Sequence, residues 1–91
     1  MTAEEFQTEL KRTGYVDIET KTNLPNASTE PHSHPFAVRA LVLAGEVTVT
    51  SEGASRTLRA GDTLEMAAGC THSERYGPEG STSVVGRKHS V

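Results

Sequence analysis

Three histidines carry the clearest chemical signal in this chain. His32 and His34 are separated by one serine, and His72 follows much later in the sequence. Side chains two residues apart on an extended strand point to the same side, so we expect His32 and His34 to share a face. Neutral imidazole is the commonest protein ligand for transition metals, and a third ring would complete a facial set. We therefore predict a divalent metal site formed by His32, His34 and His72.

Two further side chains follow His72 at strand spacing. Glu74 and Tyr76 should face the same way as His72 if the strand is regular. Glu74 would then act as a general base, as a fourth ligand or as a carboxylate that orients a ligand, and Tyr76 would donate a hydrogen bond to substrate. The plainer alternatives are an acid at a solvent-exposed rim and an aromatic ring that only lines the interior. We predict Glu74 and Tyr76 as the catalytic pair and keep these alternatives open.

Two other residues of reactive type have weaker support. Cys70 is the only cysteine, so no disulfide can form within the chain. No helix N-terminus or basic neighbour in the sequence would activate its thiol, and we expect a small, partly buried side chain. His89 lies close to the C-terminal end, where we expect a surface residue rather than a ligand.

One helix is predicted at the start of the chain. Thr2 and Glu5 have the spacing of a capping box, and Phe6 and Leu10 form an apolar stripe at i and i+4. Gly14 is a natural stop after this segment. We expect the helix to lie against the rest of the domain.

The remainder of the chain reads as short strands separated by turns. The predicted strands cover residues 15–22, 36–43, 47–50, 56–59, 63–66, 73–76 and 81–87. Residues 23–31 are predicted to be a loop, and the glycine-containing segments 44–46 and 77–80 are predicted to be turns. Seven or eight short strands with frequent glycine turns are typical of a sandwich or small barrel. The inward side chains of a small barrel converge from several strands, which favours a ligand site inside it.

Two segments of this chain resemble the two sequence motifs of the cupins. Residues 31–46 are similar to the first motif, in which a His-x-His pair precedes an acidic residue and a glycine in a hairpin. Residues 61–72 are similar to the second, in which a Gly-Asp turn and a small loop ending in glycine precede a histidine. The resemblance implies an all-β jelly-roll barrel over residues 15–88. Together with the helix and turn predicted over 1–14, this gives a single cupin domain spanning 1–91.

The resemblance carries over three ligand positions, His32, His34 and His72, and departs from the family at the fourth. The acidic position of the first motif falls at Val38 or Arg39, neither of which replaces a carboxylate. Strand parity places Val38 inward and Arg39 outward. The departure disfavours manganese, which prefers oxygen ligands, and favours iron(II) or zinc, with nickel and copper also compatible.

The resemblance leaves two classes of function open. One is an enzyme, dioxygenase-like or isomerase-like, that acts on a small carbonyl or carboxylate compound. The other is a non-catalytic cupin module that binds a small molecule or serves as a sensor. Catalysis needs an acid or base beside the metal, so the orientation of Glu74 and Tyr76 should separate the two. Cupins of this size often form dimers, and we expect a homodimer.

Charge and hydropathy limit the classes of binding partner and the cellular location that we expect for this protein. The formal net charge is −3 and the basic residues form no extended patch, which argues against nucleic acid as a partner. The longest apolar stretch, residues 40–44, is too short to span a bilayer. The first residues are acidic and polar, unlike a secretory signal. We therefore expect a soluble cytoplasmic protein that binds a small molecule.

Overall fold

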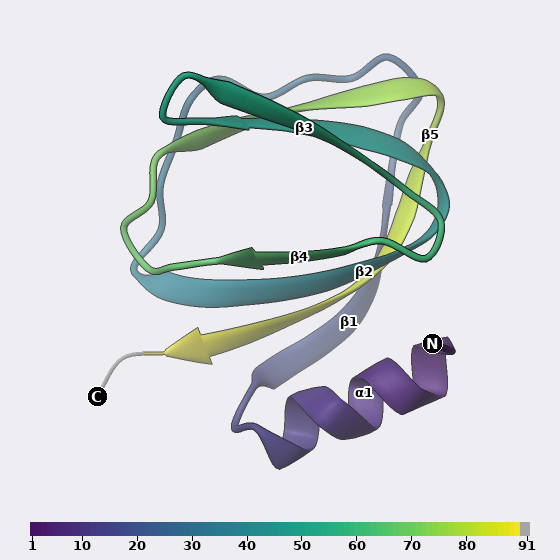
Figure 1. Ribbon diagram of the computed structural model, residues 1–91, viewed down its shortest axis with the longest axis vertical. Coiled ribbons are helices and arrows are strands. Elements are labelled where there is room, and N and C mark those ends of the chain that lie inside the picture. The colour runs from purple at the N-terminus through teal and green to yellow at the C-terminus, as the bar shows by residue number, and fades with distance from the viewer. Residues whose placement is uncertain (90–91) are drawn as a thin grey trace.

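The structure is a computed structural model that describes residues 1–89 (Figure 1). Its elements, in chain order, are α1 (Ala3–Arg12), β1 (Val16–Asn23), β2 (Phe36–Ser51), β3 (Ala54–Arg59), β4 (Thr63–Met66) and β5 (His72–His89). Over the described part of the chain, no helix has the length and apolar character needed to cross a membrane.

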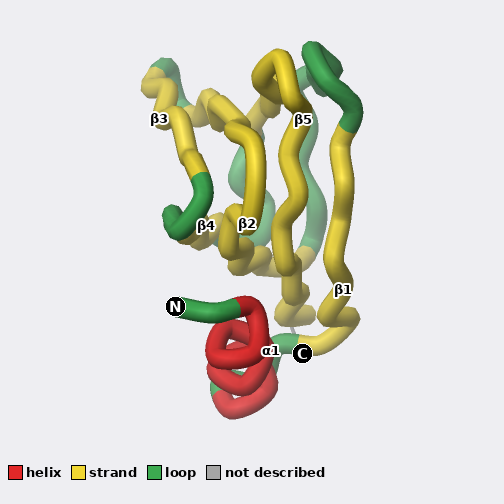
Figure 2. Tube along the Cα trace, turned by 90° about the vertical axis from the view of Figure 1, so that its right-hand side faces the viewer, coloured by secondary structure: helices red, strands yellow, loops and turns green. Residues whose placement is uncertain are grey.

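The long strands β2 and β5 form the frame of the fold. They pair antiparallel from Phe36 opposite His89 to Ser51 opposite His72, and both bend near the middle. One half of the pair lies in a sheet with β1 and β4, and the other half lies in a facing sheet with β3 (Figure 1). Figure 2 shows β1, β5 and β2 side by side, with β3 beyond β2. This arrangement confirms the predicted jelly-roll barrel with a short N-terminal helix.

Two glycines allow the paired strands to bend together. Gly45 and Gly80 both have positive φ, at 74° and 70°, and the pairing shifts register on either side of Gly45. A Cβ atom on Gly45 would overlap the carbonyl oxygen of Gly80, so the two backbones approach too closely for a side chain.

The prediction of turns at 44–46 and 77–80 was therefore wrong. Both segments stay within strands and bend there, so the predicted strands merge in pairs into β2 and β5. A β-bulge bends a strand without ending its pairing, and glycine is common at both bulges and turns.

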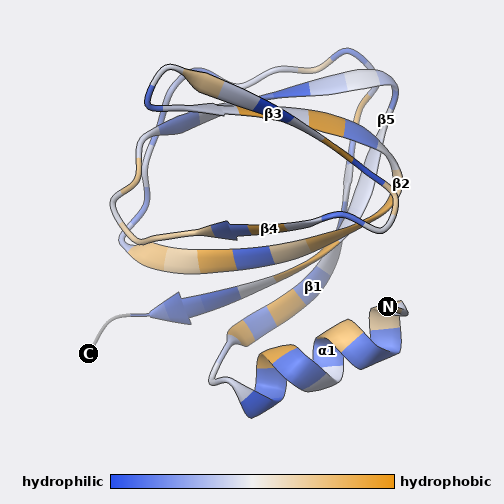
Figure 3. Cartoon of the chain, in the orientation of Figure 1, coloured by the Kyte–Doolittle hydropathy of each residue, from blue (hydrophilic) through white to orange (hydrophobic). Residues whose placement is uncertain are grey.

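The helix is built and docked as its sequence predicts. The Thr2 hydroxyl accepts a hydrogen bond from the Glu5 amide at 3.1 Å, and the Thr2 amide donates to the Glu5 carboxylate at 2.8 Å. Phe6 and Leu10 are fully buried and pack with Tyr15, Leu41 and Val84 on the outer face of the sheet that contains β1 and β4. The apolar side of α1 faces this sheet (Figure 3).

Arg39 lies on the same outer face, as strand parity predicts. Its guanidinium is 3.2 Å from the Glu9 carboxylate and lies over the Phe6 and Tyr15 rings. A second cluster of buried residues, which includes Val42, Val49 and Leu58, lies between the two sheets. The protein thus has one apolar core under the helix and another inside the barrel.

The contact between the two bends can be tested by comparing two glycine substitutions. Gly53 also has a positive φ, of 79°, but a Cβ there would meet nothing within 4 Å. We expect Gly53→Ala to lower the free energy of unfolding by about 1–2 kcal/mol, the cost of a left-handed backbone. Gly45→Ala should cost about 1–3 kcal/mol more, because the added methyl group also collides with the Gly80 backbone.

Urea unfolding followed by circular dichroism would measure both values. Equal losses in the two variants would show that the close approach at the bends does not constrain the fold.

Candidate metal centre

Backbone hydrogen bonds bring the three histidines together from distant parts of the chain. His32 and His34 lie in the extended segment before β2, and His72 is the first residue of β5. The His32 amide donates to the His72 carbonyl at 2.8 Å, and the His72 amide donates to the His32 carbonyl at 2.9 Å. The His34 carbonyl accepts a hydrogen bond from the Gly69 amide at 2.9 Å, which ties it to the loop between β4 and β5.

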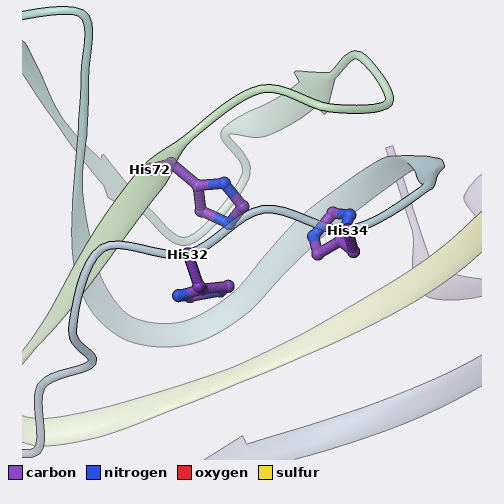
Figure 4. A group of neighbouring side chains, drawn as sticks. All are labelled: His32, His34 and His72. Atoms are coloured by element: carbon purple, nitrogen blue, oxygen red, sulfur yellow. The ribbon is translucent and has the colours of Figure 1, made fainter.

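The three imidazole rings converge on one point. One ring nitrogen from each of His32, His34 and His72 lies within 4.8 Å of the others. The ring centroids are 4.5 Å apart for His32 and His72, and 5.2 Å apart for His34 and His72. Figure 4 shows the rings from both segments gathered in one place. His72 is buried, His34 is half-buried and His32 is exposed, so the group is open to a ligand from one side.

The second nitrogen of every ring is held by a backbone carbonyl. The Nδ1 atoms of His32, His34 and His72 lie 2.8, 3.0 and 3.0 Å from the carbonyl oxygens of Glu30, Phe36 and Cys70, respectively. A carbonyl oxygen only accepts, so each neutral ring carries its proton on Nδ1 and presents the lone pair of Nε2. Metal-ligating histidines are typically oriented in this way. The residues present therefore fit a divalent metal ion.

Phe36 fixes the orientation of one ring. It stacks on His34 with centroids 4.3 Å apart and an angle of 4° between the planes. Nothing in residue spacing marks a parallel stack, so the sequence does not predict this contact. The stack and the Nδ1 hydrogen bond together restrict rotation of the His34 ring.

Glu74 and Tyr76 lie beside this centre and contact each other. Glu74 Oε1 is 3.4 Å from His72 Nε2, and Glu74 Oε2 accepts a hydrogen bond from the Tyr76 hydroxyl. Burial is the main cause that raises the pKa of Tyr76 well above its usual value, and the hydrogen bond and negative charge of Glu74 add to it. Tyr76 therefore stays protonated at neutral pH and donates to Glu74.

A cavity of about 370 Å³ inside the barrel is lined by two of the three histidines, His32 and His34. His32, His34, Glu74 and Tyr76 line its polar end, and Val38 also faces it, as strand parity predicts. This volume lies at the lower end of the range for small-molecule sites. Because Val38 is apolar, the position of the missing acid offers no oxygen ligand.

The two other residues of reactive type lie outside the cavity lining. His89 is exposed, with Nε2 2.9 Å from Asp17 Oδ2, which agrees with the predicted surface position. The Cys70 thiol is partly buried, as predicted, and lies 3.2 Å from the Ser51 hydroxyl. Cys70 contributes to the centre through its backbone rather than its thiol, because its carbonyl oxygen orients the His72 ring.

Comparison with known proteins places this chain in a family. The cupin domain, as a sequence family, matches residues 22–82. The chain belongs to the cupins. No curated protein matches this cupin.

Solved cupin structures share its fold at low sequence identity. An RmlC-like cupin from Shewanella frigidimarina is 20% identical with a TM-score of 0.70, over 80% of this chain and 65% of that one. A cupin-like protein from Thermotoga maritima is 25% identical with a TM-score of 0.67, over 81% and 56%. The DMSP lyase DddQ from Ruegeria pomeroyi is 23% identical with a TM-score of 0.72, over 81% and 38%. This cupin thus spans less than two thirds of the length of these three structures.

The stack on His34 predicts a measurable effect on metal affinity. We expect Phe36→Leu to weaken zinc binding about tenfold, because loss of an orienting contact lets a ligand ring rotate. Phe36→Tyr keeps the aromatic plane and should bind zinc like the wild type. Competition with a chromophoric chelator would measure the affinities, and equal affinity in the leucine variant and the wild type would contradict the positioning role.

Proposed function

We propose that this cupin binds a divalent metal ion through His32, His34 and His72 and acts on a small carbonyl or carboxylate compound. The observation that carries the proposal is the anchoring of three Nδ1 atoms by backbone carbonyls while one nitrogen of each ring converges with the others. Three imidazoles held in this tautomer would each present an Nε2 lone pair to a shared ion. A cation shared in this way satisfies all three.

The donor set bears on which ion is bound. Three neutral nitrogen ligands suit zinc or iron(II), and also nickel or copper, better than the hard cations that need oxygen ligands. Val38 occupies the place where the family has an acid, which supports the same choice. A bound ion of this kind supplies Lewis-acid or redox chemistry to a small molecule beside it.

Glu74 and Tyr76 are the chain's own candidates for moving a proton. Glu74 lines the cavity and is the only acid to do so within residues 1–89, so it is the group placed to accept a proton from a ligand there. The Tyr76 hydroxyl remains protonated and donates a hydrogen bond to Oε2 of Glu74, so it fixes the direction of that carboxylate. Isomerase-like or dioxygenase-like chemistry would use this pair next to the metal.

The alternative is a non-catalytic module that binds or senses a small molecule. The contacts of Glu74 favour this binding module, because one carboxylate oxygen accepts a hydrogen bond from Tyr76 and the other faces His72. A carboxylate held in this way on both sides also serves as a fixed wall of a binding site.

Metal binding can be tested by removing two of the ligands. We expect wild-type protein purified without added metal, or reconstituted afterwards, to carry stoichiometric zinc or iron. The His32→Ala, His34→Ala double variant should lose the ion, because one imidazole cannot hold it alone. His89→Ala is the matched control, since that ring is on the surface beside Asp17. Elemental analysis is the measurement, and equally little metal in wild type and double variant after reconstitution would contradict the proposal.

The choice between enzyme and binding module can be tested through Glu74. The metal-loaded protein would be offered a panel of small ketones and carboxylic acids in deuterated water. Proton exchange would be followed by NMR and oxygen consumption by an electrode. We expect turnover that falls about 10²–10⁴-fold in Glu74→Gln with unchanged metal content, because the base is lost but the ligands remain. Ligand binding without either reaction across the panel would support the binding module instead.

A further inference from the structure

The cavity has a polar patch on the side formed by β1 and β5. Lys21 and Asn23 of β1 line the cavity together with Ser81 and Ser83 of β5. Lys21 is paired directly with Ser83, and Asn23 with Ser81, across the two antiparallel strands. Paired residues on one face of a sheet have neighbouring side chains, so these four form one continuous surface, here termed the β1–β5 patch.

The rest of the lining sets this patch apart. Apolar residues from the other strands form much of the remaining wall: Val42, Val47, Val49, Leu58 and Leu64. Ser81 and Ser83 are 4% and 8% exposed, so these hydroxyls are buried at the cavity wall rather than part of the outer surface. A ligand that fills the cavity would therefore meet His32 and His34, an apolar wall and a separate polar patch.

The charges that line the cavity favour an anion. Lys21 and Arg87 are the cations, and Glu74 is the single acid among the lining residues of the described chain. This excess of positive charge is local, because the whole chain has a net charge of −3. The three neutral imidazoles add no negative charge to offset a bound divalent ion, which would increase the excess.

Lys21 is the cation that is free for a ligand. The Arg87 guanidinium already lies 3.1 Å from the Asp17 carbonyl and 3.4 Å from the Glu19 carboxylate. Lys21, by contrast, has no ion-pair partner anywhere in residues 1–89. An ammonium group flanked by serine and asparagine donors matches the oxygen atoms of a carboxylate.

We propose that the β1–β5 patch binds a second acidic group of the ligand, so that this cupin takes small dicarboxylates. One carboxylate lies at the three-histidine centre, the carbon chain lies along the apolar wall, and the other carboxylate lies at Lys21. The inference rests on the proposed metal centre and goes further by naming the class of ligand and the residue that selects it. Binding at two anchors favours a diacid over a monoacid of the same length, because only the diacid gains the charge-assisted contact with the ammonium group.

Calorimetric titration of the zinc-loaded protein tests the proposal. Succinate and glutarate are compared with butyrate and valerate, the monoacids of the same chain lengths, and zinc content is measured before and after each titration. We expect at least one diacid to bind about tenfold more tightly than its monoacid, because it gains a charge-assisted contact. Lys21→Met should remove that advantage and leave the binding of monoacids and zinc unchanged. Lys11→Met, on the exposed side of α1, is the control that keeps the advantage.

The outcomes separate this inference from the metal site itself. Equal affinity for diacids and monoacids, or an equal loss for both in Lys21→Met, overturns the inference while the zinc content upholds the metal centre. Failure of the wild-type protein to hold zinc overturns both. A selective loss of diacid binding in Lys21→Met, with normal folding by circular dichroism, supports the second anchor.

Discussion

The reciprocal backbone pairing of His32 with His72 is the constraint on which the centre depends. The long segment between β1 and β2 has little regular structure, yet it follows the edge of β5 through hydrogen bonds from Thr29 to Glu74 and from Tyr76 to Ala27. This alignment places His32 and His34 beside the start of β5, where His72 lies. Without it, the rings would belong to a free loop, whose conformational entropy would oppose assembly of the site.

The two apolar cores have different roles: the one under α1 stabilises the fold, and the one inside the barrel forms part of the cavity wall. Phe6 and Leu10 of α1 are buried against Leu41 and Val84 on the outside of the barrel. Burial of such side chains contributes about 1.5–3 kcal/mol each, which a domain of this size needs. The interior is then free to remain partly hollow, with its apolar residues shaping a cavity wall rather than filling the barrel completely. The fold thus separates the apolar surface under the helix from the surface that lines the cavity.

Local patterns predicted much of this arrangement from the sequence. The capping box and apolar stripe located the helix, and strand parity placed Val38 inward and Arg39 outward. The bends at Gly45 and Gly80 were read as turns, because glycine favours both and only the pairing of distant strands distinguishes them. The partners of the histidine rings were also beyond prediction, since they are backbone carbonyls whose positions depend on tertiary structure. The place of Lys21 in the cavity likewise follows from the register of β1 against β5.

If the three histidines hold one metal ion as proposed, each must present an unprotonated Nε2 atom to it. Long-range proton–nitrogen NMR spectra of ¹⁵N-labelled protein test this requirement most directly, because they distinguish the two ring nitrogens of each histidine. We expect protons on Nδ1 of His32, His34 and His72 before metal is added. Zinc should then shift the Nε2 resonances of these three rings together and leave His89 unchanged. Protons on Nε2 in the metal-free protein, or zinc-induced shifts that omit any of the three rings, would contradict the proposed centre.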